Sequence, residues 1–228
     1  MDSVKVNGLQ IAYKRRGKGV PLVLLHGAIS DSRIWQPQLD DLAKDFEVVA
    51  WDAPGCGRSD DPPETFRLSD YADSLAGFIT ALDLKQPHVL GLSFGGGLAL
   101  EFYQRHPKIP RSLILASAYA GWAGSLSPET VNQRLNNGIQ QSTKPPRQVV
   151  DAWISTLFAK SPPDYVLKKT AEIMSDFHPV GMRAMLRAFA EADLRHMLHT
   201  INVSTLLLYG QEDRRSPQHV AQNLHENI

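Results

Sequence analysis

Ser93 is the residue whose neighbours most clearly suggest catalytic chemistry. It stands at the centre of the pentapeptide Gly-Leu-Ser-Phe-Gly, flanked two positions to either side by Gly91 and Gly95. The apolar run 88–92 leads into this pattern as a strand would, and the run 98–106 leads out of it as a helix would. A serine in a tight strand-to-helix turn takes a strained backbone conformation, and side chains at positions 91 and 95 would collide with it. The pattern therefore predicts a nucleophilic serine whose hydroxyl stands clear of a sheet.

The expected position of Ser93 at the start of a helix favours a reaction in which negative charge develops. Backbone N–H groups at a helix N-terminus have no partner within the helix, and the helix dipole is positive there. The alternative interpretation is a flexible glycine loop with an incidental serine, because three glycines are consecutive at 95–97. The residues that follow, Leu-Ala-Leu-Glu-Phe-Tyr, favour a helix and therefore the catalytic interpretation.

The elements that must position this serine follow from the hydrophobic pattern. Strands are expected over 4–7, 10–14, 20–25, 46–51, 88–92, 111–116 and 203–209, and helices over 34–44, 68–82, 94–106 and 217–226. The helix over 68–82 has Ser69 or Asp70 as a candidate N-cap. The turn Asn7-Gly8 predicts an antiparallel hairpin at the start. This alternation predicts an α/β fold with a doubly wound, mostly parallel sheet.

The pattern changes between 119 and 200, where mostly helical residues interrupt the alternation. We expect three segments: 1–118 as the first part of the core domain, 119–200 as a helical cap inserted into it, and 201–228 as the second part of the core. The cap holds large apolar residues that are expected mainly in its core and partly along a pocket: Trp122, Trp153, Phe158, Phe177, Met182, Met185 and Phe189.

The chain resembles the α/β-hydrolase superfamily, and in particular its small, cap-bearing, serine esterase-like members. The segments that carry the resemblance are 24–27 (Leu-Leu-His-Gly), 51–60 (Trp-Asp-Ala-Pro-Gly-Cys-Gly-Arg-Ser-Asp), the turn around Ser93, and 209–213 (Tyr-Gly-Gln-Glu-Asp). The nucleophile position holds serine, which argues against the aspartate chemistry of dehalogenases and epoxide hydrolases and the cysteine chemistry of dienelactone hydrolases. Cys56 is expected to be a small structural residue, since nothing beside it in sequence would activate a thiolate.

The resemblance also implies roles for residues around the serine. It places an oxyanion hole at the backbone N–H groups of Ala28 and Phe94, where two fixed donors would face the charged oxygen of a tetrahedral intermediate. His26, with Gly27, would brace the oxyanion loop through hydrogen bonds rather than act as the base. Asp213 would hold the imidazole of a catalytic histidine in the right tautomer, and the neighbouring glutamate is the competitor for that role.

The histidine of such a triad is not found in the sequence. The resemblance places it about 25–35 residues beyond Asp213, in a loop after one more strand, and the chain ends at Ile228. None of the histidines present is expected to be the base: 26, 88, 106, 178, 196, 199, 219 and 225. The run 204–209 also has apolar residues on both faces, so as the last strand it would be an exposed sheet edge.

From these two observations we expect a truncated or partial sequence in which the last strand and helix of the fold are missing. The alternatives are a partner chain that completes the sheet and a degenerate protein without catalysis.

Composition bounds the partners and the location. Zero net charge, from 24 Lys and Arg against 24 Asp and Glu, does not favour nucleic acid. The basic pairs Arg15-Arg16 and Arg214-Arg215 are interpreted as solvated surface. No apolar stretch approaches the ~18 residues of a membrane span, and the N-terminus has no signal-peptide pattern. One cysteine, which allows no internal disulfide, fits a reducing compartment. We expect a cytoplasmic monomer or homodimer.

The function expected from these residues is hydrolysis of a small carboxylic ester or related acyl compound through an acyl-enzyme at Ser93. No metal or organic cofactor is expected, because there is no clustered His or Cys ligand pattern. The same motifs fit enol-lactone hydrolysis, carbon–carbon bond hydrolysis, cofactor-free haloperoxidation and proline iminopeptidase activity, and they do not select a substrate. From a different class, a ligand receptor without turnover fits a chain that lacks the base.

Overall fold

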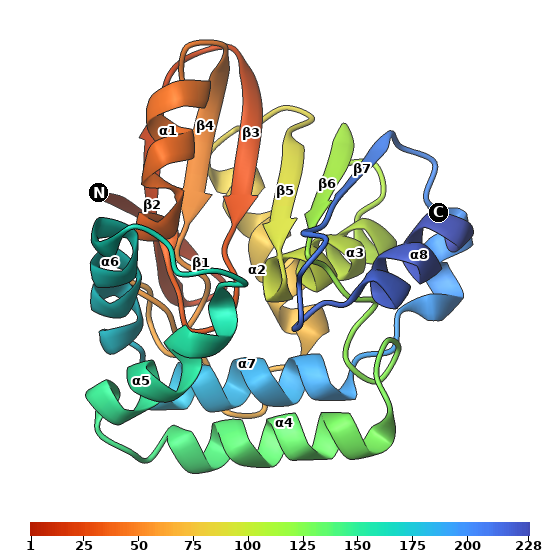
Figure 1. Cartoon of the computed structure of the whole chain (residues 1–228). Coiled ribbons are helices and arrows are strands. Elements are labelled where there is room, and N and C mark those ends of the chain that lie inside the picture. Colours follow the sequence, from red (N-terminus) through yellow and green to blue (C-terminus); the bar gives the residue numbers. More distant parts are fainter.

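The computed structural model of the chain describes residues 1–228 and is built around a seven-stranded sheet with the order β1-β2-β4-β3-β5-β6-β7 (Figure 1). The hairpin of β1 and β2 pairs antiparallel within itself and with β4, and all other pairs are parallel. The α/β fold with a doubly wound, mostly parallel sheet is therefore confirmed. The strands are β1 (Asp2–Val6), β2 (Leu9–Arg16), β3 (Val20–Leu25), β4 (Phe46–Trp51), β5 (His88–Leu92), β6 (Ser112–Ala116) and β7 (Thr205–Leu208).

The alternating residues of the central strands divide the core into two layers. In β3, Val23 and Leu25 face the larger hydrophobic cluster, whereas Leu22 and Leu24 face the smaller one. The larger cluster includes residues of α2 (Leu68–Ala81), α3 (Phe94–Arg105) and α8 (Gln218–Asn227), and the smaller one includes Leu39 of α1 (Gln36–Leu42). Both faces of the sheet are therefore covered, which explains why β3 and β4 are almost wholly apolar.

Four helices lie between β6 and β7, across the carboxyl ends of the parallel strands (Figure 1). They are α4 (Pro128–Gln141), α5 (Pro146–Leu157), α6 (Asp164–Ser175) and α7 (Pro179–Glu191), which we call the cap helices, and a 3₁₀ turn at Arg195–Thr200 follows them. In Figure 1 the arrowheads of β3 and β5 point toward these helices, so the residues that follow these strands lie beneath the cap helices.

Two glycines fix how α7 rests on the core. A Cβ atom at Gly181, in the first turn of α7, would collide with the backbone of Gly55 in the loop after β4, and a Cβ at Gly55 would collide with Gly181 in return. At the other end of α7 the Phe189 ring lies 5.4 Å from that of Phe94 and 5.9 Å from that of Tyr119, measured between centroids. Backbone contact at one end and aromatic contact at the other hold α7 against the sheet.

One helix boundary and one N-cap differ from the sequence prediction. In place of the helix expected over 34–44, the chain forms a 3₁₀ turn at Ser32–Trp35 and then α1. The second residue of α1 is Pro37, and the helix ends at Leu42. Neither Ser69 nor Asp70 is the N-cap of α2. That position is Arg67, and the Asp70 carboxylate reaches back to accept its backbone N–H at 2.8 Å.

β7 is the last strand of the sheet, next to β6 alone. Its side chains Leu206 and Leu208 are 53% and 46% exposed, so the expectation of an apolar strand at the sheet edge is confirmed. None of the helices combines the length and the apolar character that crossing a membrane would require.

Candidate active site

The single residue Ser93 makes the whole turn between β5 and α3. Its backbone has φ 53° and ψ −110°, a conformation that residues other than glycine rarely adopt. A Cβ at Gly91 would collide with the backbone of Gly95, and a Cβ at Gly95 would collide with the carbonyl oxygen that ends β3. The two glycines therefore let β5, α3 and β3 approach closely enough to hold this strained turn.

The glycines after Ser93 lie in a helix, so the flexible-loop interpretation is wrong. A Cβ at Gly96 would collide with Ala118, just beyond β6, and a Cβ at Gly97 would collide with the ring of Phe189 on α7. These close contacts with neighbouring elements offset the roughly 0.5–1 kcal/mol that each glycine costs a helix relative to alanine.

A narrow pocket of about 20 Å³ surrounds Ser93, which is half-buried. Its lining brings together three of the residues expected at the site, Ser93, Ala28 and Phe94, with residues from the cap helices and from the loop after β7. The lining is Ala28, Ser93, Phe94, Tyr119, Trp122, Arg134, Trp153, Met185, Leu186, Phe189 and Arg215.

Two backbone N–H groups at this pocket have no acceptor within their own elements. Phe94 is the first residue of α3, where an N–H has no intrahelical partner, and the N–H of Ala28 donates no hydrogen bond within the chain. The loop that carries Ala28 lies against the serine, since a Cβ at Gly27 would be 3.6 Å from that of Ser93. Both N–H groups thus lack an acceptor in the chain, and both residues line the Ser93 pocket.

His26 joins the loop after β3 to the loop after β4. The side chain is 1% exposed, and its Nε2 accepts the backbone N–H of Ala53 at 3.0 Å. The ring proton then lies on Nδ1, which is 2.8 Å from the carbonyl oxygen of Gly27 and donates to it. With both ring nitrogens engaged in this way, His26 has none free for Ser93. Asp52 is also structural, because its carboxylate accepts the backbone N–H groups of Ser32 and Arg58.

The Asp213 carboxylate is held at the carboxyl edge of the sheet, near the end of β6. It accepts the backbone N–H groups of Arg215 at 2.8 Å and Ser216 at 2.9 Å through Oδ1, and the hydroxyl of Ser117 at 2.7 Å through Oδ2. The competing residue Glu212 is exposed and lies 3.5 Å from Lys160. Asp213 is therefore the better placed of the two to hold a partner inside the site.

Ser117 was missed by the sequence reasoning. It follows β6 and has φ 46°, as Ile29 after β3 has φ 55° and Ser93 after β5 has φ 53°. Strained residues thus directly follow β5 and β6, and another lies in the loop after β3; strain of this kind gathers at functional sites. No sequence signal marks Ser117, because a serine after a strand is common and its partner Asp213 is distant in the chain.

None of the eight histidines forms a hydrogen bond with Ser93 or Asp213. His199, His219 and His225 are exposed. The other five bond elsewhere: His26 to Gly27 and Ala53, His88 to Ser112, His106 to Asp73, His178 to Asp61 and Gly57, and His196 to Gln104 and Asp193. The position of the base therefore stays a prediction.

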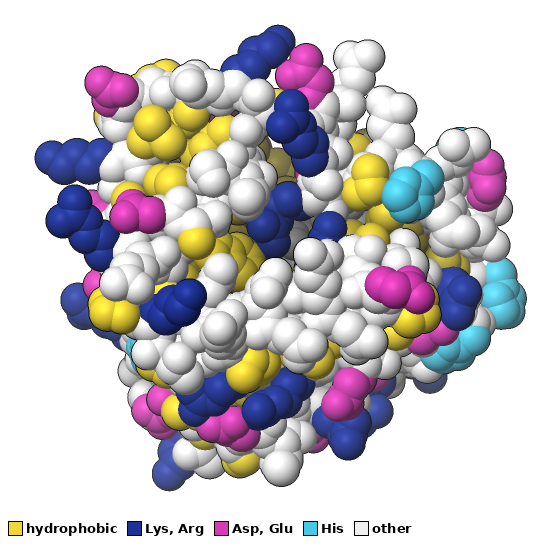
Figure 2. All heavy atoms as spheres, turned by 60° about the horizontal axis from the view of Figure 1, so that its bottom comes forward, with side chains coloured by type: hydrophobic (Ala, Val, Ile, Leu, Met, Phe, Trp, Pro, Cys, Tyr) yellow, Lys and Arg dark blue, Asp and Glu magenta, His cyan; other side chains and the backbone are white.

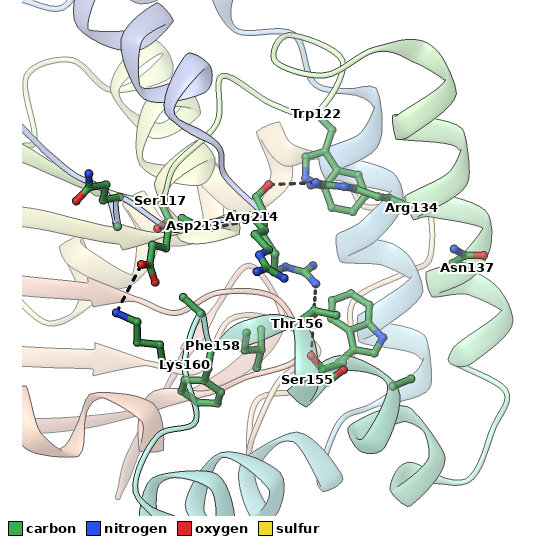
Figure 3. A pocket seen from close by; sticks show the side chains of 18 of the residues that line it. Ser117, Trp122, Arg134, Asn137, Ser155, Thr156, Phe158, Lys160, Asp213 and Arg214 are labelled. Atoms are coloured by element: carbon green, nitrogen blue, oxygen red, sulfur yellow. Dashed lines mark hydrogen bonds and ion pairs between the residues drawn. The ribbon is translucent and has the colours of Figure 1, made fainter.

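A larger cleft of about 940 Å³ adjoins the Ser93 pocket. Asp213 and Ser117 lie toward one side of it, and Arg134 and Trp122 toward the other (Figure 3). Figure 2 shows a hollow in the surface with Lys and Arg side chains inside it. Four residues line both the cleft and the Ser93 pocket and so lie at their junction: Trp122, Arg134, Trp153 and Arg215.

The interpretation of Arg214-Arg215 as solvated surface is wrong for Arg215. Arg214 is exposed, but Arg215 is half-buried, with its guanidinium 4.7 Å from the centre of the Trp153 ring. The loop after β7 turns this side chain inward under α5, a long-range effect that a basic pair in the sequence does not reveal. Arg134, on the polar helix α4, was missed for the same reason.

Other reactive or metal-binding groups are few. Burial raises the pKa of the Cys56 thiol well above its usual value, so the thiol stays protonated near neutral pH, in keeping with a structural residue. No group of three or more His, Cys, Asp or Glu side chains is arranged to hold a metal ion.

Comparison with known proteins gives several matches. A model of the alpha/beta hydrolase family matches residues 22–227. A 2-hydroxymuconate semialdehyde hydrolase of Pseudomonas sp. (strain CF600) is 29% identical over 224 residues, covering 92% of this chain and 76% of that protein. An uncharacterized protein of Mycobacterium tuberculosis is 34% identical over 113 residues, covering 50% of this chain and 33% of that protein. The chain thus spans about a third of the length of the first curated relatives that it matches.

Among solved structures, a thermophilic esterase from Thermogutta terrifontis with malate bound is similar over the whole chain. The TM-score is 0.91 at 27% identity, and the match covers 100% of this chain and 87% of that one.

Proposed function

The chain belongs to the alpha/beta hydrolase family, and from this premise we propose that it is a serine hydrolase acting on a small carboxylic ester or related acyl compound. The observation that carries the proposal is the conformation of Ser93. A non-glycine residue with φ 53° between a strand and a helix stands in one pocket with two free backbone donors. Such strain is maintained where a side chain must be presented to a reactant.

The proposed reaction proceeds through an acyl-enzyme. Ser93 Oγ attacks the carbonyl carbon, and the oxygen that becomes negative accepts the N–H groups of Ala28 and Phe94. The alcohol leaves with a proton, and water then releases the acid from the serine ester. Losing one fixed donor of this kind costs about 2.7–4 kcal/mol of transition-state stabilisation in other enzymes.

The proposal needs a base that accepts the Ser93 proton. In this scheme the base is an imidazole held by Asp213, which would fix its tautomer and stabilise the cation that forms. None of the chain's eight histidines occupies that position. The cleft beside Asp213 has a volume of about 940 Å³, which leaves room for such a group.

The size of the Ser93 pocket favours a small acyl group. Its volume of about 20 Å³ accommodates little more than one or two water-sized groups before side chains must move. Its apolar lining, from Trp122, Met185 and Phe189, suits a hydrocarbon chain next to the reacting carbonyl. Ester hydrolysis is placed first because the Thermogutta protein, similar over the whole chain at 27% identity, is an esterase.

A fluorophosphonate probe tests the nucleophile directly, because it reacts with activated serines. We expect the wild-type protein to be labelled on the peptide that contains Ser93, as located by mass spectrometry, and the Ser93→Ala variant to remain unlabelled. The matched control is Ser175→Ala, which removes an exposed serine from α6 and should leave labelling unchanged. Labelling that persists in Ser93→Ala would refute the assignment.

A ligand receptor without turnover is the second candidate, favoured by the lack of a histidine bonded to Ser93 or Asp213. It predicts that the protein binds a small molecule in the cleft but neither reacts with the probe nor hydrolyses p-nitrophenyl acetate. Labelling at Ser93 with Ser93-dependent release of p-nitrophenol would exclude it.

A further inference from the structure

Two arginines from distant parts of the sequence meet beside Ser93. Arg134 lies on α4 and Arg215 in the loop between β7 and α8, and both line the Ser93 pocket. They are the only charged residues in that lining. Both also line the larger cleft, so they stand where a molecule in the cleft would pass toward the serine.

The hydrogen bonds of the two guanidinium groups leave most of their donors free. Arg134 donates to the Tyr119 hydroxyl at 3.2 Å and to the carbonyl oxygen of Arg215 at 3.1 Å. Arg215 donates to the hydroxyl of Thr156 at 2.9 Å. A guanidinium has five N–H donors, so these bonds satisfy a minority of the ten that the pair presents.

Neither arginine has a carboxylate partner, unlike other partly buried arginines of this chain. Arg33 lies 2.7 Å from both Asp31 and Asp176, and Arg183 pairs with Glu64. Near the pair, Asp213 already accepts three hydrogen bonds, and Glu212 is exposed beside Lys160. No carboxylate therefore pairs directly with either guanidinium, and Asp213 offsets the charge of Arg215 only from beyond ion-pair distance.

Leaving two cations close together in a partly buried site is unfavourable. Burial lowers the pKa of the Arg215 guanidinium and the positive charge of Arg134 adds to this effect, whereas Tyr119 and the Asp213 carboxylate act in the opposite direction. Aromatic rings hold both groups in place, since Arg134 lies 5.7 Å from the centre of the Trp122 ring and Arg215 lies 4.7 Å from that of Trp153. Two positioned planar donors with unused N–H groups match the geometry of a carboxylate.

We propose that Arg134 and Arg215 bind a carboxylate of the substrate, so that the compound cleaved at Ser93 carries an anionic group besides its reacting acyl group. The inference rests on the proposed function only in making the ligand a substrate. The binding site itself follows from the two arginines. It places the carboxylate at the junction of cleft and pocket, with the acyl carbon directed toward the serine and the rest of the molecule in the cleft.

Binding of two esters that differ only in charge tests the inference without any turnover. Monomethyl glutarate is an anion at neutral pH, and dimethyl glutarate is its neutral counterpart. Trp122 and Trp153 line the site, so their fluorescence reports occupancy. We expect the Ser93→Ala protein, which cannot form an acyl-enzyme, to bind the monoester about tenfold to hundredfold more tightly than the diester, as charge-assisted hydrogen bonds imply.

Variants connect this preference with the arginines. In the same background, Arg134→Gln and Arg215→Gln should each reduce the ratio of the two affinities by about tenfold. Arg134→Lys and Arg215→Lys keep the charge but lose the planar fork, and should retain part of the preference. Arg147→Gln, which changes an exposed cap arginine outside both pockets, is the matched control and should leave the ratio unchanged.

The inference and the proposed function fail in different ways. Equal affinity for the two esters, no binding of either, or a preference untouched by all four arginine variants would overturn the carboxylate site. Loss of probe labelling concerns Ser93 alone. A protein that prefers the monoester but is not labelled would keep the arginine site and lose the acyl-transfer reaction.

Discussion

At the scale of single residues, the site depends on a backbone held in an unfavourable conformation. A non-glycine residue with positive φ costs about 1–3 kcal/mol, and Ser93, Ile29 and Ser117 all have this conformation in segments that follow parallel strands. The cost at Ser93 is sustained because glycines on either side of it allow three elements to pack closely. Ser93 thereby shares one pocket with Ala28 and Phe94, whose N–H groups have no acceptor in the chain.

Added imidazole should therefore raise the activity of this chain. No histidine hydrogen-bonds to Ser93 or Asp213, and the cleft next to Asp213 is open. A positioned general base contributes about 100- to 10,000-fold, so a diffusing one should recover a fraction of this effect. We expect millimolar imidazole to raise kcat/KM for p-nitrophenyl acetate at least tenfold, after the hydrolysis caused by imidazole without protein is subtracted.

The dependence on two side chains distinguishes this rescue from ordinary catalysis by imidazole. In Ser93→Ala, imidazole should accelerate hydrolysis no more than it does in buffer without protein. In Asp213→Asn the acceleration should be much weaker than in wild type, because the carboxylate that orients the ring is lost. A rescue of equal size in wild type and Ser93→Ala, measured by release of p-nitrophenol, would show that Ser93 takes no part.

At the scale of elements, α7 is the contact between the cap helices and the turn at Ser93. Its residue Phe189 is 2% exposed and packs against Phe94, Tyr119 and Trp122. The same ring approaches Gly97 so closely that a Cβ there would collide with it. One side chain thus links α7, α3 and the segment after β6, and it also lines the Ser93 pocket.

Phe189→Ala should destabilise the protein by about 3–5 kcal/mol, because it removes a large buried ring and leaves a cavity between the layers. Equilibrium unfolding in urea measures this loss. Tyr165→Ala is the control, since that aromatic side chain on α6 is 75% exposed and its removal should change the unfolding free energy by less than about 0.5 kcal/mol. A loss below 1 kcal/mol for Phe189→Ala would contradict the role given to this ring.

The elements could be predicted from the sequence where one local rule was sufficient. The strands β3 and β4 are almost wholly apolar runs, and the turn Asn7-Gly8 has the two positive φ angles that make a hairpin. The start of α2 at Leu68 was predicted correctly, but its N-cap was not, because Arg67 has none of the short polar side chains that usually cap a helix. Ser93 was identifiable from its glycines, whereas the inward position of Arg215 depends on α4 and α5, far away in the chain.

At the scale of the whole molecule, charge pairs join the cap helices to the core around the rim. Glu64, in the core loop before α2, accepts hydrogen bonds from Arg183 and from Arg187 at 2.6 Å, both on α7. Those bonds lower the pKa of the Glu64 carboxyl to about 2. Because Glu64 is exposed, solvent screening limits what the pairs contribute at neutral pH.

The pH dependence of this contribution has a defined sign. In the unfolded chain Glu64 should titrate near its ordinary pKa of about 4.3. Its depressed folded pKa therefore stabilises the protein above that value, and the contribution is lost as the pH falls toward about 2. We expect Glu64→Gln to lower Tm at pH 7 and the difference from wild type to shrink below pH 4.

Thermal melts between pH 7 and pH 3 measure this difference. Glu226→Gln, which removes an exposed carboxylate from α8, is the control and should melt like the wild type across the range. A Tm difference for Glu64→Gln that is constant with pH would mean that its charge does not stabilise the fold.

The contact between Gly55 and Gly181 sets a condition for engineering this scaffold. The two backbones touch, so a methyl group on either glycine would push the first turn of α7 away from the loop after β4. A chimera that exchanges residues 119–200 for those of a relative must therefore transplant the segment together with a matching loop after β4. The cap helices and the loop after β4 must therefore be exchanged together, although well over a hundred positions separate Gly55 from Gly181 in the chain.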